Sequence, residues 1–206
     1  MDAHRSSNEC TVLVSLSWRN DFKSEERLRN SVFFKRLSAL LKDNVWEMLR
    51  QRGVSVVMAI HHAMRRELNN AVDFGSNIKV VDPMEISEYI RKSDCLITDL
   101  SSLAFDFIYQ HKPVIFWIPD VEDYELSYVS RSKITDAAKM VPNLSCLAKS
   151  IPELSMHLLK FADKNFQIDA DVALRYDKLF FKRGHNRERL YNAIEKQWED
   201  EYIKGN

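Results

Sequence analysis

The sequence predicts an α/β fold in which helices cover both faces of a doubly wound, mostly parallel, Rossmann-like sheet. Short apolar runs rich in β-branched residues alternate with longer segments of helical periodicity along most of the chain. Hydrophobic residues make up 45% of the 206 residues, which is enough for the core of one large domain or two small ones. With only four glycines, the chain has no GxGxxG turn, and it also lacks the Walker A motif and the GxSxG elbow. These absences weigh against the dinucleotide, P-loop and hydrolase classes.

The first two predicted strands enclose a long helical segment. Residues 12–18 form a short, β-rich apolar run that ends in a polar loop, and residues 54–60 form a second such run. Between them, apolar residues recur at helical spacing over residues 33–50. Gly53 follows this segment in a position that commonly ends a helix. The pattern predicts a strand, a helix and a second strand in that order.

Helices and strands continue to alternate through the middle of the chain. Three further strands are expected at residues 78–81, 95–98 and 114–118. The accompanying helices are expected at residues 64–72, 84–91 and 102–110. Because strands that alternate with helices pair in parallel through right-handed crossovers, we predict the strand order 3-2-1-4-5.

The pattern loosens after Pro119. We expect little regular structure at 121–142, a helix at 151–161, a polar and aromatic connection at 177–186, and a charged amphipathic helix at 188–202. No internal repeat or low-complexity linker divides the chain, so residues 1–206 are interpreted as a single domain.

Charge and cysteine content limit the possible partners. Lys plus Arg and Asp plus Glu number 30 each, so net charge gives no support for a nucleic acid partner. The three cysteines form no CxxC pair, which favours a reducing compartment without structural zinc. The first residues lack the apolar core of a signal peptide, and no run reaches the roughly 18 apolar residues of a membrane-spanning helix. We expect a cytoplasmic protein, with peripheral contact at the inner face of the membrane left open.

The block from Ser93 to Asp120 carries the strongest functional signal. It predicts a buried strand, a polar turn, a helix and a second buried strand. Ser101 and Ser102 would open the helix at the carboxyl end of the first strand, where free backbone N–H groups and the helix dipole favour an anion. This arrangement predicts a phosphate site. The alternative is that one serine only caps the helix.

These residues resemble a known family. The runs 96–102 and 112–120 are similar to the signature of the CDP-glycerol glycerophosphotransferase family, the teichoic-acid and capsule polymerases and primases. Weaker similarities follow in the family's order at 16–19, 58–62 and 186–189, so the resemblance covers about residues 12–194.

The resemblance implies a GT-B architecture, in which two Rossmann-like halves face each other across a cleft. This chain corresponds to the C-terminal half, which binds the donor nucleotide, and the acceptor half is absent. The implied reaction moves an alcohol phosphate from a CDP-alcohol to a hydroxyl of a polymer or lipid-linked acceptor, and CMP leaves. The acceptor site and the base would come from a separate N-terminal half.

The resemblance also assigns roles to residues at the strand ends. His61 is the expected catalytic residue, because an imidazole there can bind the pyrophosphate or protonate the leaving phosphate. Arg19 can pair with a phosphate through its guanidinium fork, although an exposed surface ion pair is the alternative. Asp99 would bind cations, sugar hydroxyls or backbone donors, or else cap a turn.

Two further residues complete the expected donor site. Asp106, one turn into the helix, would orient a neighbouring loop. Arg187 belongs to a basic cluster near the closing helix, which contacts the donor, attaches to anionic lipid or is merely solvated. The aspartates of the Ser93–Asp120 block stand singly without a DxD pattern, so we expect neither a metal nor another cofactor at the donor site.

Three positions depart from the family pattern. His62 replaces a proline and is therefore a rival to His61 as the functional histidine. Ala59 replaces a basic residue, and Leu100 replaces a tyrosine. These departures leave two alternatives open: a GT-B glycosyltransferase half that uses a nucleotide-sugar, and a degenerate half that serves as a binding module.

Overall fold

The computed structural model describes residues 9–17, 25–60, 68, 73–99, 101–119, 146–180 and 184–199. The strands in these ranges form one six-stranded sheet, in which every neighbouring pair is parallel. In spatial order they are β3 (Ile78–Val81), β2 (Val54–Ile60), β1 (Cys10–Leu16), β4 (Cys95–Thr98), β5 (Val114–Trp117) and β6 (Cys146–Ala148). The predicted order 3-2-1-4-5 is confirmed, and β6 extends it at one edge.

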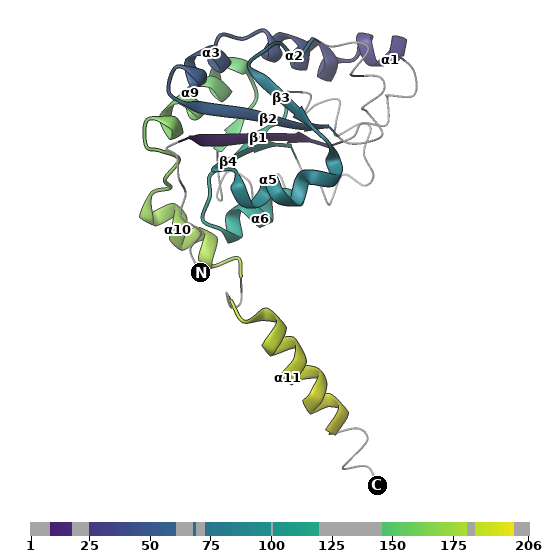
Figure 1. Cartoon of the computed structure of the whole chain (residues 1–206), viewed down its shortest axis with the longest axis vertical. Helices are drawn as coiled ribbons and strands as arrows, with labels where there is room; N and C mark the ends of the chain where they lie inside the picture. The colour runs from purple at the N-terminus through teal and green to yellow at the C-terminus, as the bar shows by residue number, and fades with distance from the viewer. Residues whose placement is uncertain are drawn as a thin grey trace.

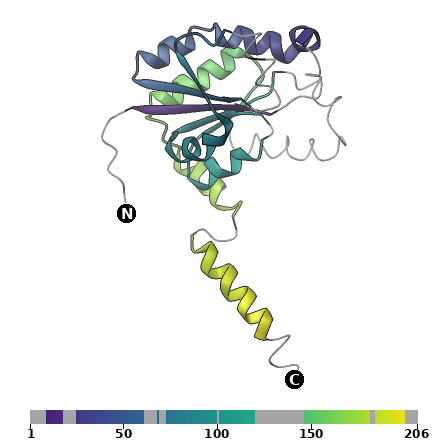
Figure 2. The same ribbon diagram turned by 45° about the vertical axis from the view of Figure 1, so that its right-hand side comes forward.

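Helices cover both faces of this sheet, as Figure 1 shows. One layer contains α1 (Glu25–Asn30), α2 (Val32–Leu41), α3 (Val45–Arg50) and α9 (Ile151–Ala162). The other contains α5 (Ile86–Lys92), α6 (Leu103–Tyr109) and α10 (Ala170–Asp177), with the 3-10 helix η1 (Pro83–Glu85) leading into α5. The last helix, α11 (Asn186–Trp198), extends away from the sheet and its layers (Figures 1 and 2). The predicted doubly wound α/β architecture is confirmed.

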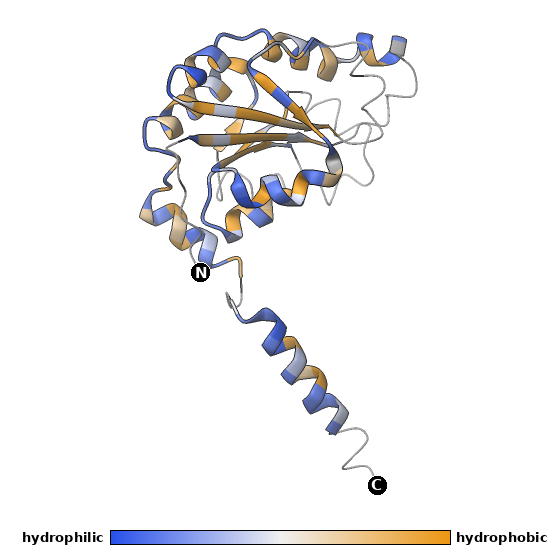
Figure 3. Ribbon diagram, viewed as in Figure 1, coloured by the Kyte–Doolittle hydropathy of each residue, from blue (hydrophilic) through white to orange (hydrophobic). Residues whose placement is uncertain are grey.

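Side chains of the central strands enter two separate cores. Along β1, Val12 and Val14 pack under the layer of α2, α3 and α9, whereas Leu13 between them packs under α6 and α10. This is the period of two that a strand imposes. Both faces are covered, so strands and inner helix faces are hydrophobic and the outer helix faces are polar (Figure 3).

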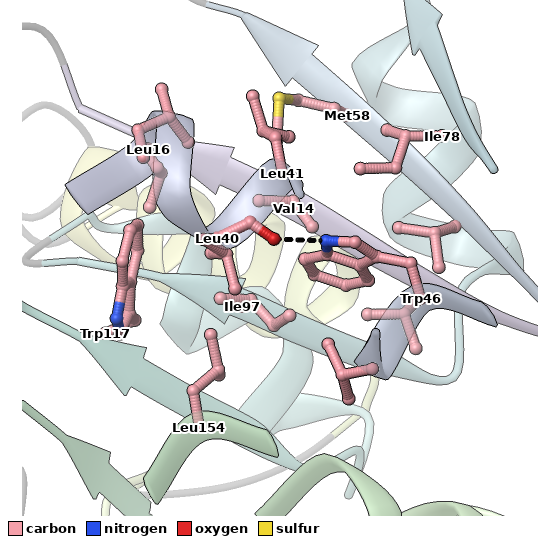
Figure 4. Packing of buried hydrophobic residues seen from close by; sticks show 14 of the residues in the cluster. Val14, Leu16, Leu40, Leu41, Trp46, Met58, Ile78, Ile97, Trp117 and Leu154 are labelled. Atoms are coloured by element: carbon pink, nitrogen blue, oxygen red, sulfur yellow. Dashed lines mark hydrogen bonds between the residues drawn. The ribbon is translucent and has the colours of Figure 1, made fainter. Parts of the chain in front are cut away.

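The segment predicted as one helix over residues 33–50 is two helices, so that prediction was wrong in detail. The Asp43 carboxylate accepts a hydrogen bond of 2.9 Å from the Val45 amide, which caps the start of α3 and breaks the chain's helical run. Trp46 then folds back, and its indole nitrogen donates to the Leu40 carbonyl at 2.6 Å, as Figure 4 shows. Periodicity alone does not reveal this turn, because the apolar residues of both helices face one core.

Three short elements were not predicted: α1, β6 and α10. β6 has three residues and α10 buries only Tyr176 fully, so neither offers a long apolar pattern. The closing helix was predicted at 188–202 and is described from Asn186 to Trp198. Two predictions, the helix at 64–72 and the irregular segment at 121–142, lie outside the described residues except at Leu68.

The sheet topology locates a natural binding edge. From β1 the chain proceeds to β2 and β3 on one side, then returns to β4, β5 and β6 on the other. The connections that leave the neighbouring strands β1 and β4 therefore run in opposite directions. Open α/β sheets bind ligands outside the carboxyl ends of the strands at such a switch point. The described residues there are Ser17, after β1, and Asp99, after β4.

Candidate functional site

Asp99 joins the carboxyl ends of β1 and β4. Its carboxylate accepts a hydrogen bond of 2.9 Å from the Ser17 amide and one of 2.7 Å from the Ser17 hydroxyl. One residue earlier, the Thr98 hydroxyl donates to the Ser15 carbonyl at 2.6 Å. Asp99 is fully buried, so its carboxylate orders the strand ends instead of projecting into solvent. We call this arrangement of Ser17 and Asp99 the edge clamp.

A similar contact fastens the opposite, amino ends of the same two strands. The Asp94 carboxylate accepts a hydrogen bond of 2.8 Å from the Thr11 amide, and the Asp94 amide donates to the Thr11 carbonyl at 2.7 Å. The register of β1 against β4 is therefore fixed by an aspartate at both ends. Only the Asp99 end coincides with the edge at which α/β proteins bind ligands.

Ser101 and Ser102 follow the edge clamp directly. The Ser101 hydroxyl accepts a hydrogen bond of 3.3 Å from the Leu103 amide, so it partly satisfies the first turn of α6. Ser102 takes the capping position, but its side chain makes no capping hydrogen bond and is exposed. Of the two roles foreseen for these serines, capping belongs to Ser101, while the Ser102 hydroxyl is available to a ligand.

The residues expected at the ends of β1 and β2 lie outside the described part of the chain. These are Arg19, His61 and His62. The strands that precede them end side by side, because Leu16 and Ile60 are register partners. The described strand ends therefore lead into one edge, the edge that also carries Ser17 and Asp99.

Asp106 and Arg187 lie apart from the edge clamp. Asp106 is exposed on α6 and lines an open pocket at the base of α11, together with Tyr109, Phe180 and Arg189. Arg187 is exposed in the first turn of α11. The structure does not bring either residue together with Ser17 and Asp99.

Two residues near the edge gain meaning only from the structure. The sequence assigned no role to Ser17. The signal that could have found it is a hydroxyl at the end of β1, because β1 pairs with β4 and Asp99 follows β4. Trp117, at the carboxyl end of β5, is fully buried in the core. Within the described residues its indole nitrogen has no hydrogen-bond partner.

Two searches of the described ranges bear on cofactors and membranes. They contain no group of three or more His, Cys, Asp or Glu residues able to hold a metal ion. None of the helices described there combines the length and apolar character needed to cross a membrane.

Comparison with known proteins gives a consistent result. A family model described as CDP-glycerol:poly(glycerophosphate) glycerophosphotransferase matches residues 12–196. A minor teichoic acid biosynthesis protein, GgaB of Bacillus subtilis (strain 168), is 26% identical over 210 residues, which cover 92% of this chain and 22% of that protein. A teichoic acid poly(ribitol-phosphate) polymerase of Bacillus spizizenii is 34% identical over 120 residues, 58% of this chain and 18% of that protein.

A solved structure shares the fold. The wall teichoic acid polymerase TagF superposes with a TM-score of 0.61 at 19% identity, covering 95% of this chain and 46% of that one. At this identity the likeness shows the fold alone. The chain thus spans about a fifth of the two curated relatives and just under half of the solved structure.

Proposed function

The chain belongs to the CDP-glycerol:poly(glycerophosphate) glycerophosphotransferase family, and on this premise we propose that it is the donor-binding half of such an enzyme. The donor is a CDP-alcohol. An acceptor hydroxyl attacks the phosphorus that carries the alcohol, the bond from that phosphorus to the CMP oxygen breaks, and the hydroxyl proton passes to a base. The products are CMP and an acceptor extended by one alcohol phosphate.

The edge clamp is the observation that carries the proposal. The diphosphate of the donor needs hydrogen-bond donors that are already in place, because negative charge accumulates on the bridging and leaving oxygens as the bond breaks. Two hydrogen bonds fix Ser17 to the buried Asp99 at the switch point, and the exposed Ser102 hydroxyl lies three residues beyond Asp99. We assign the Ser101–Ser102 turn and its backbone amides to the diphosphate.

Positive charge at the site is assigned to side chains from the neighbouring strand ends. Arg19 would hold a phosphate through its guanidinium fork, and His61 would donate a proton to the CMP phosphate as it leaves. His62 is the second candidate for the histidine role. We further propose that the transfer needs no metal ion when these groups are in place.

The other half of the site is assigned to a further segment or a separate chain. Since the chain spans less than half of the solved TagF structure, the acceptor, a polymer or lipid-linked glycol phosphate, would be held by that second half together with the catalytic base. We place the reaction in the cytoplasm at the inner face of the membrane. Ala59 and His62, which depart from the family pattern, favour one second candidate function, a donor-binding module without turnover.

Calorimetric titration with CDP-glycerol, CDP-ribitol, CMP, UDP-glucose and GDP-mannose tests the donor assignment. We expect the two CDP-alcohols to bind and the uridine and guanosine donors not to bind. The proposal is refuted if none of the cytidine nucleotides binds at about 1 mM, a dissociation constant that corresponds to a binding free energy of about 4 kcal/mol. Adding the missing half from a relative then separates the two functions: polymer formation supports the enzyme, and binding without turnover supports the module.

A further inference from the structure

A second, cationic pocket lies where the chain passes from one face of the sheet to the other. It is a cavity of about 150 Å³ between the end of α9 and the start of α10. Cys146, the first residue of β6, belongs to its lining, and Phe161, Ile168 and Val172 form apolar walls.

This pocket is distinct from the edge clamp. α9 and α10 lie on opposite faces of the sheet, and the link between them passes from one face to the other at the side where β1 and β2 begin (Figure 1). Cys146 begins its strand, so the pocket opens at the amino side of the sheet. Ser17 and Asp99 follow the ends of their strands, on the carboxyl side. The pocket therefore takes no part in the proposed donor site.

Three cations line the pocket against one carboxylate. Lys160, Lys164 and Arg175 supply the positive charge, and Asp169 supplies the negative charge. Lys164 is bound to Asp169 at 2.7 Å, a hydrogen bond that lowers the pKa of that carboxyl. Lys160 makes no ion pair or hydrogen bond with any described residue. Arg175 forms an ion pair of 3.4 Å with Asp171, so among the described residues the three cations exceed these two carboxylates by one positive charge.

Lys160 and Arg175 both influence the thiol of Cys146, which belongs to the lining of the cavity. Burial raises the pKa of the Cys146 thiol, while Lys160 from α9 and Arg175 from α10 both act to lower it. Two cations on different helices are therefore close enough to the same thiol to influence it. The neighbouring His157 is partly buried, and burial followed by Lys160 lowers its pKa, so it adds no charge at neutral pH.

We propose that this pocket binds one phosphate group, either as a free ion or within a phosphodiester. Inorganic phosphate and a phosphodiester carry about one to two negative charges at neutral pH, so either is attracted to the remaining positive charge. Arg175 offers a guanidinium fork, and Lys160 offers an ammonium that makes no ion pair or hydrogen bond with a described residue, a combination suited to phosphate oxygens. The apolar walls suit the carbon atoms of a short alcohol esterified to the phosphate.

Alkylation of Cys146 gives a direct assay with an internal control. The thiol is partly exposed in the cavity, and Cys10 is a second partly exposed thiol outside it. We expect inorganic phosphate to slow alkylation of Cys146 and not of Cys10, as followed by mass spectrometry against sodium chloride of equal ionic strength. Equal effects of phosphate and chloride on Cys146 at about 10 mM would overturn the proposal.

Charge-neutralising variants on the intact chain complete the test. Lys160→Gln with Arg175→Gln should weaken protection by phosphate at least about tenfold, because two charge-assisted hydrogen bonds are lost. Lys178→Gln, at the end of α10 and outside the pocket, should leave protection unchanged. Equal protection in the double variant and the wild type would overturn the proposal. Stronger protection by a short glycerol phosphodiester than by inorganic phosphate would identify a polymer segment as the ligand. Stronger protection by inorganic phosphate would identify free phosphate as the ligand.

Discussion

Asp99 connects the two strands that meet at the switch point, and it does so as a buried carboxylate with hydrogen-bond donors already in place. Its oxygens accept from both the amide and the hydroxyl of Ser17. A buried carboxylate is costly unless such donors satisfy it, so the clamp is at once a stabilising contact and a fixed geometry for the edge. We regard Asp99 as a positioning residue, and Ser102 as the residue that touches the donor.

Asp99→Asn tests the positioning role. The amide group presents a donor where the carboxylate accepted, so one Ser17 donor loses its partner. We expect the free energy of unfolding in urea to fall by about 2 kcal/mol and the CDP-alcohol affinity to fall with it. Asp94→Asn is the matched control, because Asp94 binds Thr11 at the amino ends of the same strands. Equal loss of donor affinity in both variants would show that the clamp acts only through general stability.

Ser102→Ala separates ligand binding from helix capping. The Ser102 side chain is exposed and makes no capping hydrogen bond, so its loss should change the free energy of unfolding by less than about 0.5 kcal/mol. The affinity for the CDP-alcohol, measured by calorimetry, should drop by about fivefold or more, since a hydrogen bond to a charged group is lost. A destabilised variant with unchanged affinity would instead assign the hydroxyl to the helix.

At the scale of elements, α2 and α3 act as one unit because Trp46 joins them. Its indole nitrogen donates to the Leu40 carbonyl at 2.6 Å inside the core beneath both helices. Trp117, equally buried in the same core, has no such partner among the described residues. The two tryptophans therefore share burial and differ in hydrogen bonding.

Replacing each tryptophan by phenylalanine isolates the hydrogen bond. Both variants lose a similar volume, but only Trp46→Phe also removes a buried hydrogen bond, while the Leu40 carbonyl keeps the one it accepts from the Asp43 amide at 2.9 Å. We expect Trp46→Phe to cost about 1 kcal/mol more than Trp117→Phe in urea unfolding. If Trp117→Phe is the more destabilising variant, the two helices do not depend on this bond.

The helix α9 makes stability depend on pH through His157. Burial, assisted by Lys160, lowers the pKa of this imidazole below its usual 6.5. As the pH falls, the unfolded chain takes up the proton first, so the stabilisation is complete above about pH 6.5 and is lost as the pH falls through the folded-state pKa. The urea midpoint should fall more steeply between about pH 7.5 and about pH 5.5 in the wild type than in His157→Gln. Parallel curves for the two proteins would contradict this account.

At the scale of the whole molecule, the sheet was the most predictable feature. Buried strands such as 54–60 and 95–98 are almost entirely apolar, and alternation with helices allows few topologies, so the order 3-2-1-4-5 followed. The elements missed were short or weakly buried: β6 is recognisable only by its pairing with β5, and the break at Asp43 depends on one side-chain hydrogen bond.

The site was predictable in location but not in detail. Ser101 and Ser102 were identified because a polar turn follows a buried strand, which is a local pattern. The bond between Ser17 and Asp99 joins residues 82 positions apart in the sequence, and only the register of β1 against β4 brings them together. Likewise, the pocket of Lys160 and Arg175 requires two helices from opposite faces of the sheet. Contacts of this kind depend on the tertiary structure and produce no periodic pattern in the sequence.

The central claim is that the carboxyl edge between β1 and β4 binds the diphosphate of a CDP-alcohol. The most direct measurement is a titration of the isotopically labelled chain with CDP-glycerol, followed by amide chemical shifts in NMR. The amides of Ser17, Ser101 and Ser102 should move together and saturate, while those of Thr11 and Asp94 at the opposite edge stay in place. Saturable binding that leaves the three serine amides unmoved would contradict the account.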